Sequence, residues 1–321
     1  MNVPPKDRFL RFRVRPWGLL ASAGLVASIA TLLGFLGRFG WFADLFSNFR
    51  VQYFIGLAVV AVLVLIPRWR KMAVCFGVIA LVNLGTIVPL YLGRPPEQPK
   101  VGQTQRAMLI NVNTARGDAN RVAAAIRQYN PDILVLEEVS ERWIGQLESA
   151  TSAYAFSRIV PRDDNFGIAL FSKHPFIFCD VVVLSESGVP SIFAALKTPS
   201  GTLTVLATHP VPPAGGEYSR WRNQQLAKIP ELTGLAGKRM ILLGDLNATP
   251  WSHHFRQLVR RSGLIDSAQG RGFQPTWPTH NPLLFIPIDH CLHSRDIQIT
   301  NREIGPNVGS DHYPLVIDWR L

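Results

Sequence analysis

Three long apolar runs near the start of the chain limit its possible folds more than any other feature. They cover residues 17–36, 51–66 and 72–92. A helix needs about 20 apolar residues to cross a bilayer, and roughly 17 is the lower limit, so the second run has to include a few flanking residues. One such run would also suit a buried core helix. Three in succession, each bounded by Arg or Lys, predict three transmembrane helices within residues 17–92.

The distribution of cations predicts the orientation of these helices. Basic residues concentrate before the first run and between the second and third: Lys6, Arg8, Arg11, Arg13, Arg15, Arg68, Arg70 and Lys71. The loop between the first and second runs has only Arg38 and Arg50, with Asp44 against them. Because cytoplasmic loops carry the excess of Lys and Arg, the basic tail at residues 1–16 is predicted to be cytoplasmic. After three crossings, the remaining chain lies on the extracytoplasmic side of a bacterial-type inner or plasma membrane.

The first apolar run also fits a second interpretation. A basic stretch followed by an apolar one is typical of a cleaved signal peptide as well as of an anchor. Ala21, Ser22 and Ala23 lie too early in the run for a cleavage site, so we expect an uncleaved anchor. Cleavage would leave the C-terminal domain on the same side.

The net charge of +11 belongs mostly to the N-terminal third of the chain. Residues 1–100 hold 12 Lys and Arg against 3 Asp and Glu, a balance of +9, whereas residues 101–321 hold 21 against 19, a balance of +2. The basic character therefore follows from membrane topology, and bulk charge gives no argument for nucleic-acid binding by the C-terminal part.

A Pro- and Gly-rich linker at residues 93–104 separates this region from a domain at residues 105–321. Short apolar runs and amphipathic stretches alternate in this domain, with Asp118 and Ser252 as helix caps and a helix at residues 217–229. Many strands with a few intervening helices predict an α+β fold: a four-layer α/β sandwich of two packed, mainly antiparallel sheets flanked by helices. Cys179 and Cys291 fall in strand-like runs, where we expect free thiols.

Polar residues that are costly in a core recur at the ends of the predicted strands. They are Asn111, Glu137, Glu138, Thr208, His209, Asp245, Asn247, Asp289, His290, Asp311 and His312. Each has an ordinary explanation alone, because a strand-end Asp or Asn usually makes a turn and a lone His usually fills a structural role. Their recurrence at one strand end after another predicts a shared site.

In this order the residues resemble the endonuclease/exonuclease/phosphatase superfamily. The matching stretches are INVN (110–113), PDILVLEE (131–138), GIALFSKHP (167–175), THP (208–210), GDLN (244–247), IDH (288–290) and GSDHYP (309–314). The resemblance covers nearly all of residues 105–321 and none of the apolar region. GDLN and SDHYP are the specific signals, whereas the others are weak alone.

The resemblance implies a divalent-metal-dependent hydrolase of phosphate esters. The metal, Mg²⁺ or Mn²⁺, would be bound by Glu138 with help from Asn111 and Asp311, since hard cations prefer oxygen ligands. A cation, an oriented water and donors for the developing charge are what phosphate ester hydrolysis requires.

The resemblance also assigns catalytic roles. Asp245 would orient or deprotonate the attacking water, with Asn247 hydrogen-bonding to it and to the phosphate. His312 would contact the phosphate, oriented by Asp289, and pairing of this kind raises the pKa of a histidine. His209 would be a second phosphate-facing histidine and a candidate acid for the leaving oxygen. Which histidine protonates which oxygen stays open.

Other residues are weaker candidates. Asn113, Asn165 and Arg222 are candidate substrate contacts, and Asn113 stands where some nucleases carry Asp. Glu137 departs from the family pattern, which commonly has Gln before the metal-binding Glu. Its carboxylate either tightens metal binding or faces the helix layer, and we favour the second.

Composition leaves the substrate open between a nucleic acid, a lipid headgroup and a soluble phosphate ester. A bilayer would be within reach of a tethered domain, yet the loops show no obvious apolar hairpin that would enter lipid. A non-catalytic membrane receptor or scaffold on the same fold is the alternative from another class. No protein partner is evident.

Overall fold

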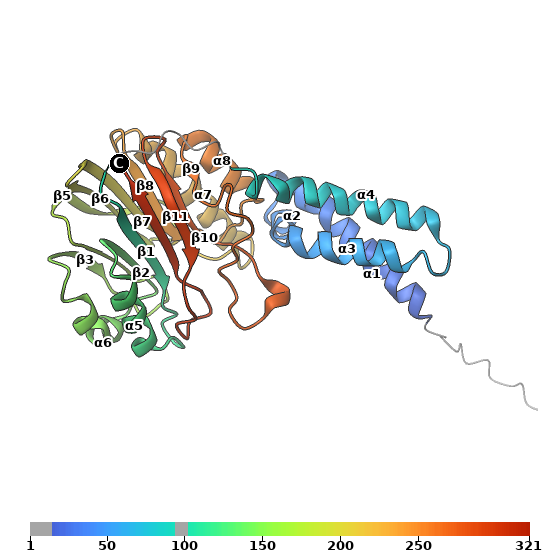
Figure 1. The fold of residues 1–321 in the computed structure, drawn as a ribbon, viewed down its shortest axis with the longest axis horizontal. Coiled ribbons are helices and arrows are strands. Elements are labelled where there is room, and N and C mark those ends of the chain that lie inside the picture. Colours follow the sequence, from blue (N-terminus) through green and yellow to red (C-terminus); the bar gives the residue numbers. More distant parts are fainter. Residues whose placement is uncertain (1–14, 94–101) are drawn as a thin grey trace, which may run out of the picture.

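The computed structural model describes residues 15–93 and 102–321. The predicted basic tail, apart from its last residues, and most of the predicted linker lie outside the described residues. Two parts are visible in Figure 1, an elongated helical bundle and a sandwich of two sheets with helices on its outer faces.

The bundle consists of four α-helices and three short 3-10 segments among the described residues: α1 (Pro16–Leu33), η1 (Gly34–Phe39), α2 (Trp41–Leu45), η2 (Phe46–Phe49), α3 (Arg50–Leu63), α4 (Arg70–Ile87) and η3 (Val88–Leu90). Three stretches, Pro16–Phe39, Trp41–Leu63 and Arg70–Leu90, are long and apolar enough to cross a membrane. The second begins earlier than the sequence predicts, because helical structure continues through the polar turn that contains Asp44 and Arg50.

The bundle has an apolar surface and polar groups in its interior. Large apolar side chains on its outside, such as Leu25, are exposed, whereas Thr31, Arg50 and Asn83 are buried. Arg50 Nη1 donates to the carbonyl of Thr31, and the Asn83 amide donates to the Thr31 hydroxyl at 2.9 Å. A helical bundle surrounded by water has polar residues outside and apolar residues inside, which is the opposite distribution. Polar residues of a membrane bundle face its interior in this way.

The C-terminal domain contains two six-stranded sheets, with strand orders β11-β12-β1-β2-β4-β3 and β5-β6-β7-β8-β10-β9. The strands are β1 (Gln105–Asn111), β2 (Ile133–Glu137), β3 (Phe156–Val160), β4 (Ile168–Ser172), β5 (Phe176–Val183), β6 (Pro190–Thr198), β7 (Gly201–Thr208), β8 (Met240–Asp245), β9 (Ile265–Asp266), β10 (Asp289–His293), β11 (Gln298–Ile304) and β12 (Leu315–Arg320). Only β1 with β2 and β7 with β8 pair in parallel, so the predicted sandwich of mainly antiparallel sheets is confirmed.

Helices cover the two outer faces of the sandwich: α5 (Ala119–Tyr129), α6 (Glu141–Thr151), α7 (Gly216–Thr233) and α8 (His253–Ser262), with the short η4 (Pro282–Leu284) in a loop. The side chains of β2 divide between two layers. Ile133 and Val135 join the core between the sheets, whereas Leu134 and Leu136 pack with α5 and α6. A third cluster joins α7 and α8 to the second sheet.

Several local expectations are confirmed. Asp118 and Ser252 each accept backbone N–H groups at the start of a helix, as the cap positions predict. Cys179 and Cys291 are free thiols on separate strands. Helix α6 and strand β3 were not among the expected elements.

Candidate active site

Strand pairing brings the polar strand ends together from both sheets. In the first sheet, the parallel register of β1 and β2 places Asn111 opposite Glu137. In the second sheet, the antiparallel register of β8 and β10 places Asp245 opposite Asp289. Since the two sheets pack face to face, the ends of four strands that are distant in sequence meet at one edge of the sandwich.

His312 and Asp289 form the expected pair. His312 Nδ1 lies 2.9 Å from Asp289 Oδ2, and both side chains are buried. Burial lowers the pKa of His312, but the carboxylates of Asp289 and Asp245 outweigh it and raise that pKa to about 10. His312 is therefore an imidazolium at neutral pH, with its Nε2 directed away from Asp289 and toward Asp245.

Asp245 lies between two histidines. Its Oδ2 is 3.6 Å from Nε2 of His209 and 3.6 Å from Nε2 of His312. Burial raises the pKa of Asp245, but the two imidazoliums outweigh it and the net shift is downward. Burial likewise lowers the pKa of His209, whereas the hydrogen bond to Asp245 and the field of Glu137 raise it to about 9. The result is one ionised carboxylate held between two cations.

Asn247 fixes the loop after β8. Its backbone N–H donates to Asp245 Oδ1 at 2.8 Å, and its side-chain amide donates to the carbonyl of Pro210 at 2.9 Å. Its φ of +49° is in the left-handed region, which Asn adopts more readily than most residues. The Asn side chain thus joins the Asp245 loop to the segment that follows His209.

Glu138 and Asp311 are two further acidic residues that line the pocket. The Asn111 amide donates to Glu138 Oε1 at 2.9 Å, and the Asn113 amide donates to Asp311 Oδ1 at 2.6 Å. Burial raises the pKa of Asp311, but His312 and the hydrogen bond from Asn113 outweigh it, so that pKa is lowered. Each carboxylate is oriented by an amide, and since an ionised carboxylate has about four lone-pair sites, each keeps acceptor capacity for a ligand.

These carboxylates fit a hard divalent cation. Glu138 and Asp311 line the same pocket, and carboxylate oxygens are the ligands that Mg²⁺ prefers, usually with several waters. The Asn111 side chain donates to Glu138 and accepts from the Asn113 N–H, so it orients the Glu138 carboxylate.

A different group also has the spacing of a metal site. Asp245, Asp289 and His312 place ligand atoms within 4.8 Å of one another. His312 Nδ1 is already hydrogen-bonded to Asp289 Oδ2, however, so this nitrogen is engaged within the group itself.

Glu137 does not face the helix layer, so the favoured expectation for this residue is wrong. It is fully buried on the same face of β2 as Ile133 and Val135, which is the face between the sheets. The backbone N–H of Asp245 donates to its carboxyl group at 3.1 Å. Burial raises the pKa of Glu137 well above its ordinary value.

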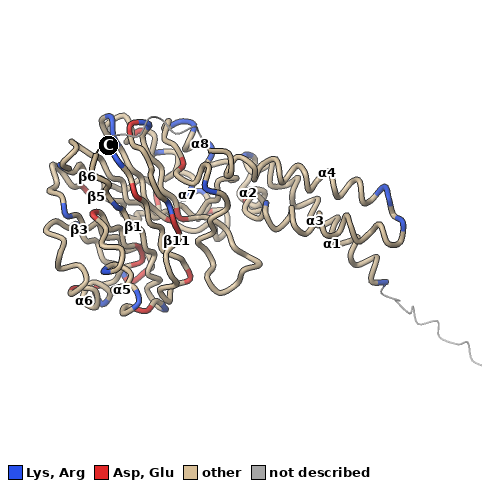
Figure 2. Tube along the Cα trace, in the orientation of Figure 1, with Lys and Arg blue, Asp and Glu red and all other residues tan. Residues whose placement is uncertain are grey.

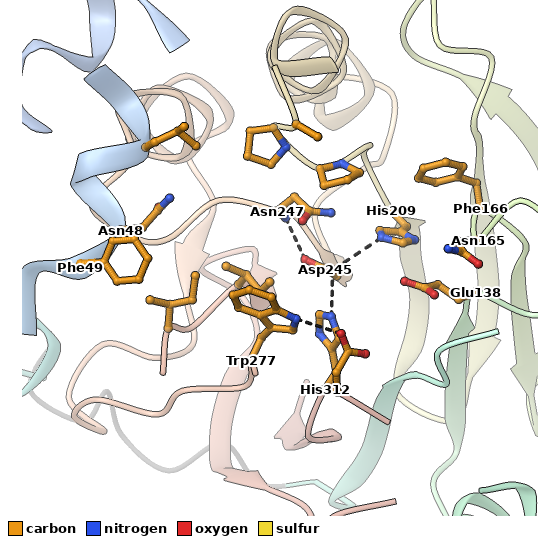
Figure 3. Close-up of a pocket in the computed structure, with 17 residues that line it drawn as sticks. Asn48, Phe49, Glu138, Asn165, Phe166, His209, Asp245, Asn247, Trp277 and His312 are labelled. Atoms are coloured by element: carbon orange, nitrogen blue, oxygen red, sulfur yellow. Dashed lines mark hydrogen bonds and ion pairs between the residues drawn. The ribbon is translucent and has the colours of Figure 1, made fainter. Parts of the chain in front are cut away.

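The catalytic groups open into a pocket of about 520 Å³. Figure 3 shows Asp245 and Asn247 near its centre, His209 and Glu138 on one side, and Asn48 and Phe49 on the opposite side. A pocket that joins apolar walls to convergent polar groups with shifted pKa values is a candidate active site.

Sequence comparison agrees with this geometry. A model of the Endonuclease/Exonuclease/phosphatase family matches residues 108–312, which include every strand end that lines the pocket. The chain belongs to this family. Its members are phosphoesterase hydrolases. No curated protein matches the chain.

Solved structures of the endonuclease/exonuclease/phosphatase family share the fold. An endonuclease/exonuclease/phosphatase from Beutenbergia cavernae DSM 12333 is 22% identical with a TM-score of 0.57, over 68% of this chain and 72% of that one. D. rerio TDP2 complexed with single-strand DNA product is 14% identical with a TM-score of 0.56, over 68% and 100%. A mannosyl-6-phosphatase from Bacteroides thetaiotaomicron VPI-5482 is 18% identical with a TM-score of 0.56, over 68% and 100%. At these identities the likeness concerns the fold.

Of two weaker candidates for substrate contacts, one lines the pocket and the other does not. Asn165 is exposed and lines the pocket beside Phe166. Arg222 does not contact the pocket, so its expected role in substrate binding is not supported. Its guanidinium is buried against Asp44 at 2.9 Å and donates to the carbonyl of Asn247.

The sequence motifs did not reveal several residues that contact the site or line its pocket. Trp277 Nε1 donates to Asp311 Oδ2 at 3.1 Å, and the Thr276 hydroxyl accepts the backbone N–H of Asp289. Leu45 and Phe49 line the pocket from the bundle. The only sequence signal for the last two was their place in a polar interruption between apolar runs.

Proposed function

We propose that this chain is a membrane-anchored, divalent-metal-dependent hydrolase of phosphate esters. The observation that carries the proposal is Asp245 held 3.6 Å from both His209 and His312, in a pocket that Glu138 and Asp311 also line. A neutral or purely structural site has no need of a buried carboxylate between two imidazoliums, because burying charges is costly.

The residues divide the work of hydrolysis. The Nε2 protons of His312 and His209 bind phosphate oxygens and neutralise charge that develops on them. Asp245 holds the attacking water, and Asn247 fixes the orientation of the Asp245 carboxylate through its N–H. Asp289 keeps His312 protonated at Nδ1 and correctly oriented. A bound Mg²⁺ or Mn²⁺ on Glu138 and Asp311 would supply positive charge for the phosphate oxygens.

The proton balance closes within the site. The oxygen of water forms the new bond to phosphorus, and its proton passes to Asp245. The bond from phosphorus to the leaving oxygen breaks, and that oxygen takes the Nε2 proton of His209. Asp245 then returns its proton to His209 over the 3.6 Å that separates them, which restores both groups.

The helical bundle supports the membrane part of the proposal. Its surface is apolar, and its three apolar stretches are each long enough to cross a bilayer. Figure 2 shows Lys and Arg at the end of the bundle farthest from the domain, where Arg68, Arg70 and Lys71 lie. By the positive-inside rule this end is cytoplasmic and the catalytic domain extracytoplasmic. A C-terminal reporter that is active only in the cytoplasm would contradict this orientation.

The test of catalysis uses the full chain, purified in detergent, with bis-p-nitrophenyl phosphate and Mg²⁺, Mn²⁺ or chelator. We expect turnover that chelator abolishes. Asp245→Asn and His312→Gln each lower kcat by about 10²-fold or more, the range for loss of an acid–base group. Glu138→Gln raises the metal concentration needed for half-maximal rate.

Matched controls separate chemistry from folding. Asp180→Asn and His280→Gln change the same residue types at exposed positions outside the pocket, so both retain turnover. Thermal unfolding of every variant identifies any that fail to fold. Full activity of a folded His312→Gln protein would refute its assigned role, and absence of metal-dependent turnover would favour the receptor or scaffold alternative.

A further inference from the structure

The catalytic pocket has a wall that the helical bundle supplies. Leu45, Asn48 and Phe49 line it, all from the α2–η2 segment at the domain end of the bundle. In Figure 3, Asn48 and Phe49 lie across the pocket from His209 and Glu138. The Asn48 side chain accepts a hydrogen bond from the Thr249 hydroxyl at 3.0 Å, which fixes this wall to the loop after β8. The pocket is therefore complete only when both parts of the chain are present.

The pocket lining combines polar and apolar groups. The histidines and carboxylates come from the strand ends of the domain, whereas the apolar residues come from both the bundle and the domain. The apolar lining residues are Leu45, Phe49, Phe166, Pro212, Pro213, Ala214, Trp277, Ile286 and Ile288. A phosphate group requires only the polar side, and an apolar wall of this size gains free energy only when an apolar group covers it. The pocket is thus built for an amphiphilic ligand.

The apolar surface continues out of the pocket toward the bundle. The loop that supplies Ile286 also carries Leu283 and Leu284, which are 79% and 41% exposed. The Gln52 side chain of α3 donates to the Phe285 carbonyl at 2.7 Å, so this loop is attached to the bundle. Figure 1 shows the segment before β10 projecting from the domain on the side that carries the bundle. The sequence shows no apolar hairpin that would enter lipid, but the structure exposes two leucines at the tip of this loop.

Charge at the pocket does not suit a polyanion. No Lys or Arg is among the described residues that line it, whereas Glu138, Asp245 and Asp311 are. Binding of a nucleic-acid backbone draws on several Lys or Arg contacts to successive phosphates. A single phosphate between His209 and His312 needs no such row of cations.

We propose that the substrate is a phosphate ester of a lipid in the same bilayer. The lipid phosphate lies between His209 and His312, and the first part of its apolar chain lies against Leu45, Phe49 and Ile286. The exposed leucines at the loop tip contact the bilayer beside the bundle, so the lipid reaches the pocket without leaving an apolar environment. This inference rests on the proposed phosphoesterase function and names its substrate class.

The experiment compares long-chain and short-chain forms of one headgroup. The full chain is reconstituted in phosphatidylcholine vesicles that contain phosphatidic acid, a phosphomonoester, or phosphatidylglycerol, a phosphodiester. The same protein in detergent is given the dihexanoyl forms, bis-p-nitrophenyl phosphate and single-stranded DNA. We expect one long-chain lipid to be hydrolysed with kcat/KM at least about tenfold above its dihexanoyl form, the gain from covering two further methylene groups.

Variants of the apolar wall test its role. Phe49→Ser, and Ile286→Ser on the other side of the pocket, each lower the ratio of lipid to bis-p-nitrophenyl phosphate turnover by about tenfold. Phe49→Leu restores most of this ratio because it keeps an apolar group. Phe39→Ser is the matched control, since Phe39 is an exposed aromatic residue of the bundle that does not line the pocket. It leaves the ratio unchanged.

The outcomes for the two proposals are distinct. Turnover of bis-p-nitrophenyl phosphate without hydrolysis of either lipid overturns the lipid inference and leaves the phosphoesterase function intact. Preference for single-stranded DNA, or an unchanged ratio in folded Phe49→Ser and Ile286→Ser proteins, also overturns it. Absence of turnover on every substrate overturns the proposed function and this inference together.

Discussion

The buried ion pair between Asp44 and Arg222 makes the attachment of bundle to domain testable. Asp44 lies in α2 and Arg222 in α7, with Oδ2 and Nη2 2.9 Å apart and side chains that are 3% and 2% exposed. Asp44 also accepts hydrogen bonds from the Ser252 hydroxyl and the His253 N–H. One carboxylate therefore satisfies groups from both α7 and the start of α8.

Asp44→Ala removes all of these contacts at once. Arg222 is left as a buried cation without a counter-charge, and loss of one partner of such a pair costs about 3–5 kcal/mol. A domain of this size loses about 2–4 °C in Tm for each kcal/mol, so Tm falls by about 6–20 °C. We also expect kcat to fall, because Arg222 holds the Asn247 carbonyl at 2.9 Å and Asn247 in turn orients Asp245.

The measurement is thermal unfolding of the full chain in detergent, with turnover assayed on the same samples. Glu186→Ala is the control, since it removes a partner of Arg220 from an ion pair whose side chains are 57% and 63% exposed. Such a pair contributes at most about 1 kcal/mol. A double variant, Asp44→Leu with Arg222→Met, removes both buried charges and recovers most of the lost stability.

Two results would contradict this reasoning. If Asp44→Ala lowers the free energy of unfolding by no more than the exposed-pair control, the ion pair does not hold the two parts together. If the double variant is no more stable than the single one, an uncompensated charge on Arg222 is not the cause of the loss.

Three further predictions concern the catalytic edge. Glu137→Gln keeps the size of the side chain and an oxygen that accepts the Asp245 N–H, so activity stays within about threefold of the parent. Glu137→Ala opens a cavity and costs about 2–4 kcal/mol in chemical denaturation. Strong loss of metal affinity in the Gln variant would instead make Glu137 a metal ligand. Gly244→Ala should unfold the domain or lower Tm by more than about 10 °C, because its Cβ would lie 1.9 Å from the Thr208 carbonyl oxygen, and a Tm equal to that of the parent would refute the close approach. The pKa of His209 is raised to about 9, above the unfolded value of ~6.5, so its stabilising interaction is complete below pH ~6.5 and is lost as pH rises through 9. Tm measured with chelator should fall across that window, less steeply in His209→Gln, and equal slopes would exclude this linkage.

Much of the fold follows from local patterns in the sequence. The first and third apolar runs are long enough by themselves to cross a membrane as helices, whatever they pack against, whereas the second reaches that length only with flanking residues. Asp118 caps α5 through its own side chain, an interaction within one helical turn. The ends of the buried strands were visible because Asp, Glu and His interrupt apolar segments, and this placed Asp245, Asp289 and His312 in one expected site.

The direction of Glu137 was decided by tertiary structure. Strand β2 is buried on both faces, so the alternation of side chains shows that Glu137 shares a face with Ile133 and Val135 but not which face meets the second sheet. The packing of β8 beneath it then supplied the Asp245 N–H as its partner. The sequence allowed two interpretations of Glu137, and the position of the second sheet decided between them.

The sequence by itself determined that this chain joins an apolar helical region to a domain with the residues of phosphate ester chemistry. Only the tertiary structure decided how the two parts meet. The contacts that join them pair residues far apart in the chain, as Asp44 does with Arg222 and Asn48 with Thr249, and no local periodicity encodes such a partner. Nothing in the sequence distinguishes Phe49 from the other apolar residues of the bundle. It lines the candidate active site only because the bundle packs against the loops after β7 and β8.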